Sequence, residues 1–154
     1  MCYHDAVIKP YEQKLIIVGV VLNKSGEILL TQRYDPELSD AHLKWDLPGG
    51  KREPGEALED TCRREVVEET GYRVDVEGMI PYHFEYTWNS DRRVLDVVIL
   101  GFLCNVTGGK PNLDDHKVND LKWVAPSGID QLETLVGTPE FIRAMIETKA
   151  RPSS

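Results

Sequence analysis

The stretch from Gly50 to Tyr72 constrains the fold of this chain more than any other. It predicts a helix that begins near Glu56, directly after a Pro-Gly pair that disfavours helical structure. The helix should end at Gly71, because glycine readily adopts the left-handed conformation of a helix C-cap. At ~3.6 residues per turn, one side of this helix carries an apolar stripe that should face a core. The stripe consists of Leu58, Cys62 and Val66.

Acidic residues crowd the second half of the predicted helix. Glu65 and Glu69 lie one turn apart on nearly the same side as the apolar stripe, and Glu68 lies at its flank. Like charges at this spacing repel each other, and a buried carboxylate without a partner is costly. A hard divalent cation would remove both penalties, because Mg²⁺ and Mn²⁺ prefer carboxylate oxygens. From the helix pattern alone, an acidic helix end exposed to solvent explains the same residues equally well.

The spacing of the fixed residues separates these two interpretations. The stretch resembles the Nudix box of the Nudix hydrolase family: G, five residues, E, seven residues, then R-E-aliphatic-x-E-E-x-G-aliphatic. The matching positions are Gly50, Glu56, Arg64, Glu65, Val66, Glu68, Glu69 and Gly71. The one departure is Tyr72, where the family usually has Ile, Leu or Val. The run from Trp45 to Gly49 also resembles the approach to the box in that family.

The resemblance implies a divalent metal, Mg²⁺ with Mn²⁺ as a substitute, and a set of ligands for it. The expected ligands are the carboxylates of Glu65, Glu68 and Glu69 and the backbone carbonyl of Gly49. Arg64 would hold a box glutamate in position, which is compatible with an i, i+4 ion pair to Glu68. Glu56 would either bind metal indirectly or tie the loop to the helix, and the structural role is favoured.

Nudix hydrolases commonly add an acid from a loop outside the box, as a metal ligand or general base. The candidates here are Asp114, Asp115 and Asp120, with His116 beside them. Asp115 is the first choice, because it precedes the strand at Trp123 by the interval at which the family's loop acid tends to fall. A polar turn without catalytic function is the alternative for each of them.

The expected reaction is Mg²⁺-dependent hydrolysis of a phosphoanhydride in a nucleoside diphosphate linked to another group. The chain lacks the family's coenzyme A signature, and Trp88 stands where ADP-ribose enzymes usually have a proline. We therefore expect a nucleoside triphosphate, including oxidised forms such as 8-oxo-dGTP, to be cleaved to monophosphate and pyrophosphate. The alternatives are ADP-ribose, a dinucleoside polyphosphate, or a nucleotide-binding sensor without activity. Substrate contacts are expected from Arg33, Lys51, Phe84 and Tyr86.

The whole chain suits a single domain, residues 1–154 with a core at about 14–148, because 154 residues can bury a proper core. The net charge of −8 argues against polymeric nucleic acid as a partner and leaves a small nucleotide possible, since a bound cation inverts the local field. No apolar run is long enough for a membrane span. The few cysteines fit a reducing cytoplasm. A monomer and a homodimer are both compatible with these features.

The remaining pattern predicts an α/β protein with the Nudix fold, a mixed, curved sheet between helices (α/β/α) that carries the box as a loop-helix-loop. Residues 1–13 are expected to be a loose lead-in, and residues 151–154 to be disordered. Strands are expected at 15–22, 27–33, 45–47, 72–78, 83–88, 94–106 and 121–124. Two further helices are expected, one from Ser127 to Leu135 and one from Thr138 to about Thr148.

Overall fold

The computed structural model describes residues 8–151, and strand β1 (Tyr11–Leu22) runs through the centre of its sheet. Along its full length β1 pairs in parallel with β6 (Val94–Gly109). Its other edge pairs antiparallel with β4 (Gly49–Lys51) in the middle and with β2 (Ile28–Arg33) at the end. The sheet is therefore mixed, as expected, because among the strand pairs within residues 8–151 β1–β6 is parallel and the others are antiparallel.

The sheet is completed by strands at both ends. β5 (Tyr72–Asn89) pairs antiparallel with β6 and forms one edge. On the other side of the sheet, β3 (Trp45–Asp46) and β7 (Val118–Val124) both pair with β2. This arrangement brings the start of the predicted box, on β4, next to the middle of the central strand.

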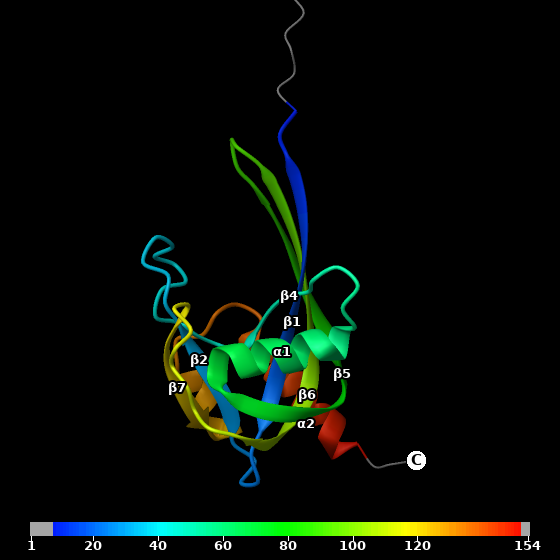
Figure 1. The fold of residues 1–154 in the computed structure, drawn as a ribbon, viewed down its shortest axis with the longest axis vertical. Coiled ribbons are helices and arrows are strands. Elements are labelled where there is room, and N and C mark those ends of the chain that lie inside the picture. Colours follow the sequence, from blue (N-terminus) through cyan, green and yellow to red (C-terminus); the bar gives the residue numbers. More distant parts are fainter. Residues whose placement is uncertain (1–7, 152–154) are drawn as a thin grey trace, which may run out of the picture.

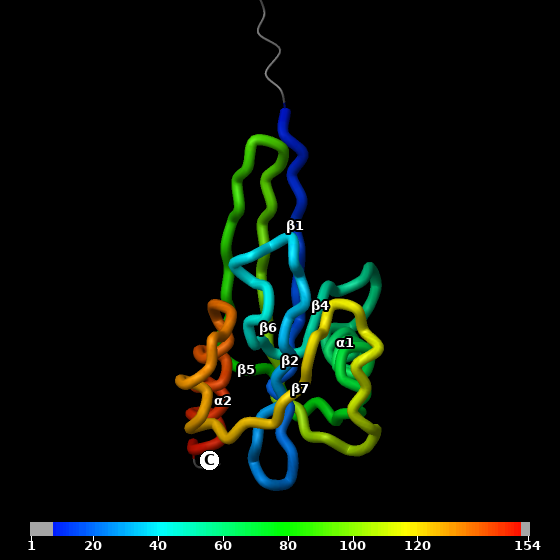
Figure 2. Tube along the Cα trace, turned by 90° about the vertical axis from the view of Figure 1, so that its left-hand side faces the viewer, coloured from blue at the N-terminus to red at the C-terminus, as the bar shows by residue number. Residues whose placement is uncertain are grey.

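Helices cover both faces of the sheet, which confirms the α/β expectation. Figure 2 shows α1 (Leu58–Thr70) on one side, and α2 (Thr138–Ala150) with the 3₁₀ helix η1 (Pro126–Gln131) on the other. Alternate residues of β1 point to opposite faces. Ile17 and Val21 pack beneath α1, whereas Val18, Val20 and Leu22 pack on the side of α2. Burial of a Val, Leu or Ile side chain in this way contributes ~1.5–3 kcal/mol.

The predicted apolar stripe of α1 faces the core as expected. Cys62 and Val66 are fully buried, and Leu58 packs against the same cluster. The helix ends at Gly71, whose φ of 81° is the left-handed conformation that the sequence predicts. It begins at Leu58 rather than near Glu56, because Ala57 is the extended N-cap residue.

One prediction near the start of the chain is wrong. Tyr11 and the two residues after it belong to β1 instead of a loose lead-in, because they pair with the start of β6. The predictions for residues 1–7 and 152–154 lie outside the described residues. Within residues 8–151, no helix is long and apolar enough to cross a membrane.

The helix predicted from Ser127 to Leu135 is also wrong. Ser127 lies inside η1, which ends at Gln131. The segment that follows is bound to β3 instead: the Trp45 N–H donates to the Glu133 carbonyl, and the Leu135 N–H donates to the Trp45 carbonyl, both at 2.9 Å. These backbone bonds hold the segment extended, so the helix cannot continue.

The most conspicuous part of the fold is a projecting arm, which we define as residues 11–15 of β1 and the hairpin 83–98 of β5 and β6 (Figure 1). The expected strands at 72–78 and 83–88 are one strand, β5. Its register with β6 shifts at irregularities that lie between Arg73 and His83. These irregularities let a single long strand pass from the body into the arm.

Candidate active site

The site is built where β4 passes beneath the second half of α1. A Cβ atom at Gly50 would overlap the carboxyl group of Glu65, and one at Gly49 would overlap the backbone of β1 at Ile17. The N–H of Gly49 donates to Oε2 of Glu69 at 3.2 Å. Both positions need glycine, because only a backbone without a side chain leaves room for the two carboxylates and the central strand.

Burial makes negative charge unfavourable at both carboxylates. Desolvation raises the pKa of Glu69 to about 8, and the nearby charges of Glu65, Asp46 and Asp115 act in the same direction. The hydrogen bond from Gly49 opposes this rise. Desolvation also raises the pKa of Glu65, against the opposing effect of Arg64. The site therefore concentrates carboxylate oxygens in a place where they lack sufficient positive charge.

Arg64 organises the outer side of the site. Its Nε and Nη2 donate to the two oxygens of Glu56 at 2.7 and 3.0 Å, and its Nη1 donates to Glu65 Oε1 at 2.8 Å. It also reaches Glu68 at 3.3 Å and the Lys51 carbonyl at 3.1 Å. Arg64 therefore holds a box glutamate and forms the i, i+4 pair at the same time, as the sequence suggests.

Glu56 has the structural position that the sequence favours. Besides the bidentate pair with Arg64, its carboxylate accepts a hydrogen bond from the Thr61 hydroxyl at 2.6 Å. These hydrogen bonds hold the pKa of Glu56 down at about 2. Through these hydrogen bonds Glu56 ties the loop before α1 to the helix and also fixes the side chain of Arg64.

The predicted metal ligands are not equivalent in the structure. Glu65 and Glu69 face β4, whereas the side chain of Glu68 is 52% exposed and meets Arg64. Among residues 8–151, no three His, Cys, Asp or Glu side chains form a ready-made metal-binding group. Glu65 and Glu69 do fit Mg²⁺, which is usually held by one or two carboxylates, with water and substrate phosphates supplying the other oxygens.

The structure distinguishes between the candidate loop acids. The negative charge of Asp115 contributes to the raised pKa of Glu69. Its Oδ1 also accepts a hydrogen bond from the N–H of Lys117 at 2.8 Å, which fixes the turn. Asp120 lies in β7, where its Oδ1 accepts from the Leu121 N–H.

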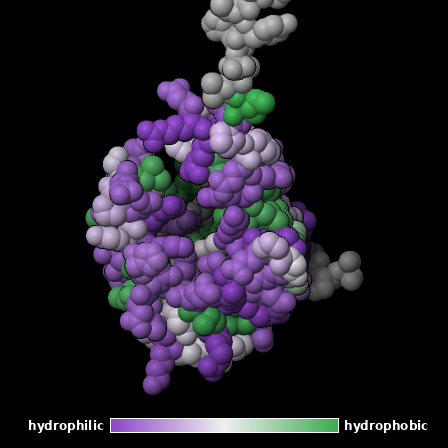
Figure 3. Space-filling view, turned by 45° about the horizontal axis from the view of Figure 1, so that its top comes forward, coloured by the Kyte–Doolittle hydropathy of each residue, from purple (hydrophilic) through white to green (hydrophobic). Residues whose placement is uncertain are grey.

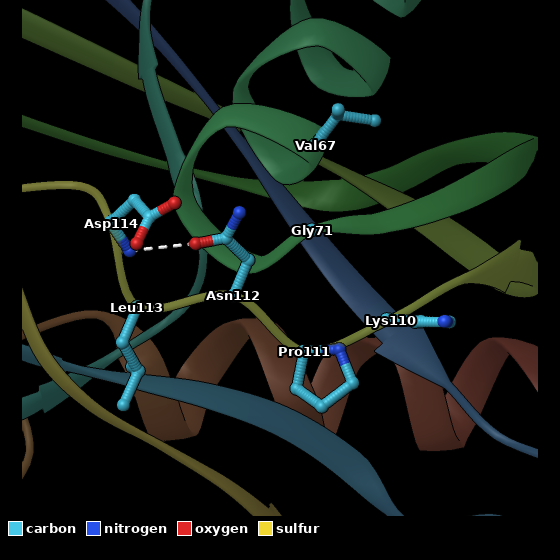
Figure 4. Close-up of a pocket in the computed structure, with 7 residues that line it drawn as sticks. All are labelled: Val67, Gly71, Lys110, Pro111, Asn112, Leu113 and Asp114. Carbon is cyan, nitrogen blue, oxygen red and sulfur yellow. Dashed lines mark hydrogen bonds between the residues drawn. The ribbon is translucent and has the colours of Figure 1, made fainter.

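Asp114 lies elsewhere, in a surface pocket at the C-terminal end of α1 (Figure 4). This pocket is also lined by Val67 and Gly71, and the Asp114 N–H donates to Oδ1 of Asn112 at 2.7 Å. Val67 is two positions from both Glu65 and Glu69, which places it ~200° around the helix from each of them. Asp114 therefore lies on the side of α1 away from the paired carboxylates.

Two charged residues near the site are not singled out by the sequence analysis. Asp46 is half-buried on β3, and its Oδ1 accepts hydrogen bonds from the Leu47 N–H at 2.7 Å and the Thr138 hydroxyl at 3.0 Å. Burial raises its pKa, and its charge acts on Glu69. The positive charge of Lys117 lowers the pKa of Glu65. The position of Asp46 directly before Leu-Pro-Gly-Gly is the sequence signal that could have indicated it.

The predicted substrate residues lie on different elements. Arg33 ends β2 and pairs with Asp35 at 3.3 Å, and Lys51 is exposed on β4. Phe84 and Tyr86 share one face of β5, with their ring centroids 5.9 Å apart. Figure 3 shows a mainly hydrophilic surface with a hollow in which hydrophobic atoms are visible. The contacts of these four residues with a substrate remain predictions.

Comparison with known proteins decides the family. The model of the NUDIX domain matches residues 13–145, which is most of the chain. The chain belongs to the Nudix hydrolase family. As a Nudix hydrolase, it carries the matched box on β4 and α1, where the carboxylates of Glu65 and Glu69 meet the glycine pair. The sequence-based identification of the family is confirmed.

Individual relatives of this Nudix hydrolase agree with that assignment. A Bacillus subtilis (strain 168) protein named as a candidate 8-oxo-dGTP diphosphatase is 36% identical over 107 residues, which are 70% of this chain and 63% of the relative. The chain thus spans less than two thirds of that relative's length. The nucleoside triphosphatase NudI of Enterobacter sp. (strain 638) is 23% identical, and the matched region covers 79% of this chain and 88% of the length of that relative.

A solved structure confirms the Nudix fold. The MutT Nudix hydrolase from Burkholderia pseudomallei superposes with a TM-score of 0.71 at 21% identity, covering 86% of this chain and 98% of that one. The mixed sheet between α1 and α2 is therefore the Nudix fold that the sequence predicts.

Proposed function

We propose that this Nudix hydrolase cleaves nucleoside triphosphates, including oxidised forms, to the monophosphate and pyrophosphate in a Mg²⁺-dependent reaction. The observation that carries the proposal is the pair of half-buried carboxylates, Glu65 and Glu69, that lie against Gly50 and Gly49. Burial raises the pKa of both carboxyl groups, so a bound cation would stabilise their ionised forms, and Mg²⁺ is commonly shared between protein carboxylates and substrate phosphates.

Each residue of the site has a definite task in this proposal. Glu65 and Glu69 would hold the cation together with the Gly49 carbonyl. When bound, the cation would supply charge stabilisation at the phosphate oxygens and a lower pKa for the attacking water. Arg64 keeps Glu65 in place through its 2.8 Å hydrogen bond, and Glu56 keeps Arg64 in place. Asp115, whose charge reaches Glu69, is the proposed proton acceptor.

The triphosphate is favoured over larger substrates for two reasons. The relatives named above carry the names of an 8-oxo-dGTP diphosphatase and a nucleoside triphosphatase. The chain also has Trp88 at the position where ADP-ribose enzymes of the family usually have a proline. Phe84 and Tyr86 could stack on the base, and stacking discriminates poorly among bases. We therefore expect modest base selectivity.

Product analysis by ion-exchange chromatography tests the proposal. The purified protein is incubated with Mg²⁺ and a panel of normal and oxidised nucleoside triphosphates, ADP-ribose and a dinucleoside polyphosphate. We expect monophosphate and pyrophosphate from the triphosphates. Cleavage of ADP-ribose or the dinucleotide with untouched triphosphates would show that the alternative substrate class is correct. Binding without turnover of any compound would indicate a nucleotide sensor.

A further inference from the structure

In the arm, β1 and β5 each have one edge that pairs with no other described strand, and the two edges differ in how well they are protected against pairing with another chain. Among the described residues, the first part of β1 pairs only with β6, and residues 83–89 of β5 also pair only with β6. Exposed edge strands invite pairing with other chains, and proteins commonly prevent it with lysine, proline or β-bulges. Lys9 and Pro10 directly precede β1 and Lys14 lies within it, so this edge is protected in this way.

The edge at β5 has none of these features. Residues 83–89 contain no lysine and no proline. The register irregularities of β5 lie between Arg73 and His83, so the pairing with β6 is regular from His83 to Asn89. Large side chains also remain exposed there, since Tyr86 and Trp88 are 45% and 52% accessible. This edge is therefore regular, free of lysine and proline, and partly apolar, with Glu85 as its one acidic side chain.

We propose that residues 83–89 pair antiparallel with the same segment of a second copy of this chain. Identical edges associate about a two-fold axis, so the residues of one copy pair in reverse order with the same residues of the other copy. Pairing over the full segment places the axis at Tyr86. Phe84 then lies opposite Trp88 of the second copy, and Glu85 lies opposite Thr87. This register joins aromatic side chains on one face and sets no like charges opposite each other on the other face.

The shape of the molecule permits this contact. The arm projects well beyond the helices and the rest of the sheet, and β5 forms its outer strand (Figures 1 and 2). Two copies joined along this strand therefore keep their bodies apart. A contact confined to the arm is smaller than a standard interface of ~1,600 Å², so the dimer should dissociate on dilution in the micromolar range.

Sedimentation equilibrium of the full chain tests the proposal. Wild-type protein should shift from a 17.5 kDa monomer toward twice that mass as its concentration rises. Thr87→Glu places a new carboxylate opposite Glu85 of the second copy, twice per dimer, and should raise the dimer Kd about tenfold. The double variant Glu85→Lys/Thr87→Glu places opposite charges across the same register and should restore the Kd.

Gln13→Glu is the matched control. Thr87 and Gln13 both lie directly opposite Asp96 of β6, one on each side, so each new carboxylate has Asp96 as its neighbour within the chain. The Thr87 hydroxyl also donates a hydrogen bond to Oδ1 of Asp96 at 2.9 Å, so Thr87→Gln, which loses that bond without adding a charge, is a second control that should leave the Kd unchanged. Only position 87 faces the proposed partner, so Gln13→Glu should leave the Kd unchanged. A wild-type protein that stays monomeric at several hundred micromolar overturns the proposal. An equal effect of both single glutamate variants, no effect of Thr87→Glu, or a double variant that stays weak overturns it as well.

Discussion

The carboxyl group of Glu65 fills the space into which a side chain at Gly50 would project. A Gly50→Ala substitution must therefore displace this carboxylate or the strand that carries residue 50. Displacing a catalytic group by ~1 Å can cost about 10²-fold in rate, so we expect a loss of kcat of that order. Steady-state kinetics measures the loss. Gly78→Ala is the control, because a Cβ there meets nothing within 4 Å, and its activity should match the wild type.

The hydrogen bonds that the Arg64 guanidinium makes to Glu56 and Glu65 should be needed for both stability and turnover, and a lysine cannot replace them. Arg64→Lys keeps the charge but cannot bind both oxygens of Glu56 while holding Glu65, so we expect a lower melting temperature and at least a tenfold lower kcat. Arg63→Lys is a matched control on the next residue, where the arginine makes an exposed pair with Asp60. Similar thermal melts and rates for both variants would contradict the organising role of Arg64.

The pKa of Glu69 predicts how the stability of the metal-free protein depends on pH. The folded-state pKa of about 8 lies above the ordinary value of 4.5, so between these values the folded protein binds more protons than the unfolded chain. The free energy of unfolding should therefore fall as the pH rises from about 5 to 8. Urea unfolding in EDTA across this range measures the slope.

Two substitutions assign that slope to its source. Glu69→Gln removes the titrating group and should make the slope in EDTA shallower. Glu59→Gln alters an exposed side chain in the first turn of the same helix and should leave the slope as it is in the wild type. Adding Mg²⁺ should stabilise the wild type more at high pH than at low pH, because the cation binds the ionised carboxylate. A slope that survives Glu69→Gln would assign the pH dependence to other groups.

The loop acids should differ in their importance for turnover. Asp115→Asn should lower kcat by about 10²-fold, in the range for a lost acid–base group, because its charge reaches Glu69. Asp114→Asn should stay close to wild type, because Asp114 lies in the pocket beside Val67. Rates of both variants at saturating Mg²⁺ measure this difference. A larger loss for Asp114→Asn than for Asp115→Asn would reverse the assignment.

Much of the fold follows from local sequence patterns. The alternation around Ile17 and Val18 and the stripe of Cys62 and Val66 show which surfaces are buried, because burial follows the strand and helix periods. The segment from Ser127 to Leu135 was mispredicted, because its backbone bonds to β3 depend on a distant strand. Such tertiary pairing leaves no periodic signal in the segment itself.

The candidate site also has features that local sequence patterns predict and features that depend on distant parts of the chain. Glu65 and Glu69 could be predicted, because residues one helical turn apart share a side of the helix. The environment of Asp46 could not, since Thr138 donates to it from a helix far along the chain. The greater exposure of Glu68 agrees with its expected place at the flank of the apolar stripe, whereas the way in which Arg64 divides its hydrogen bonds among Glu56, Glu65 and Glu68 could not be predicted.

The rate of triphosphate hydrolysis in Glu65→Gln and Glu69→Gln tests the central claim, that these two carboxylates hold the catalytic cation. With saturating Mg²⁺, each variant should lose at least ~10²-fold in kcat while keeping the wild-type circular dichroism spectrum. The wild type should lose its activity in excess EDTA. Near wild-type rates in either variant, or full wild-type activity in excess EDTA, would contradict the claim.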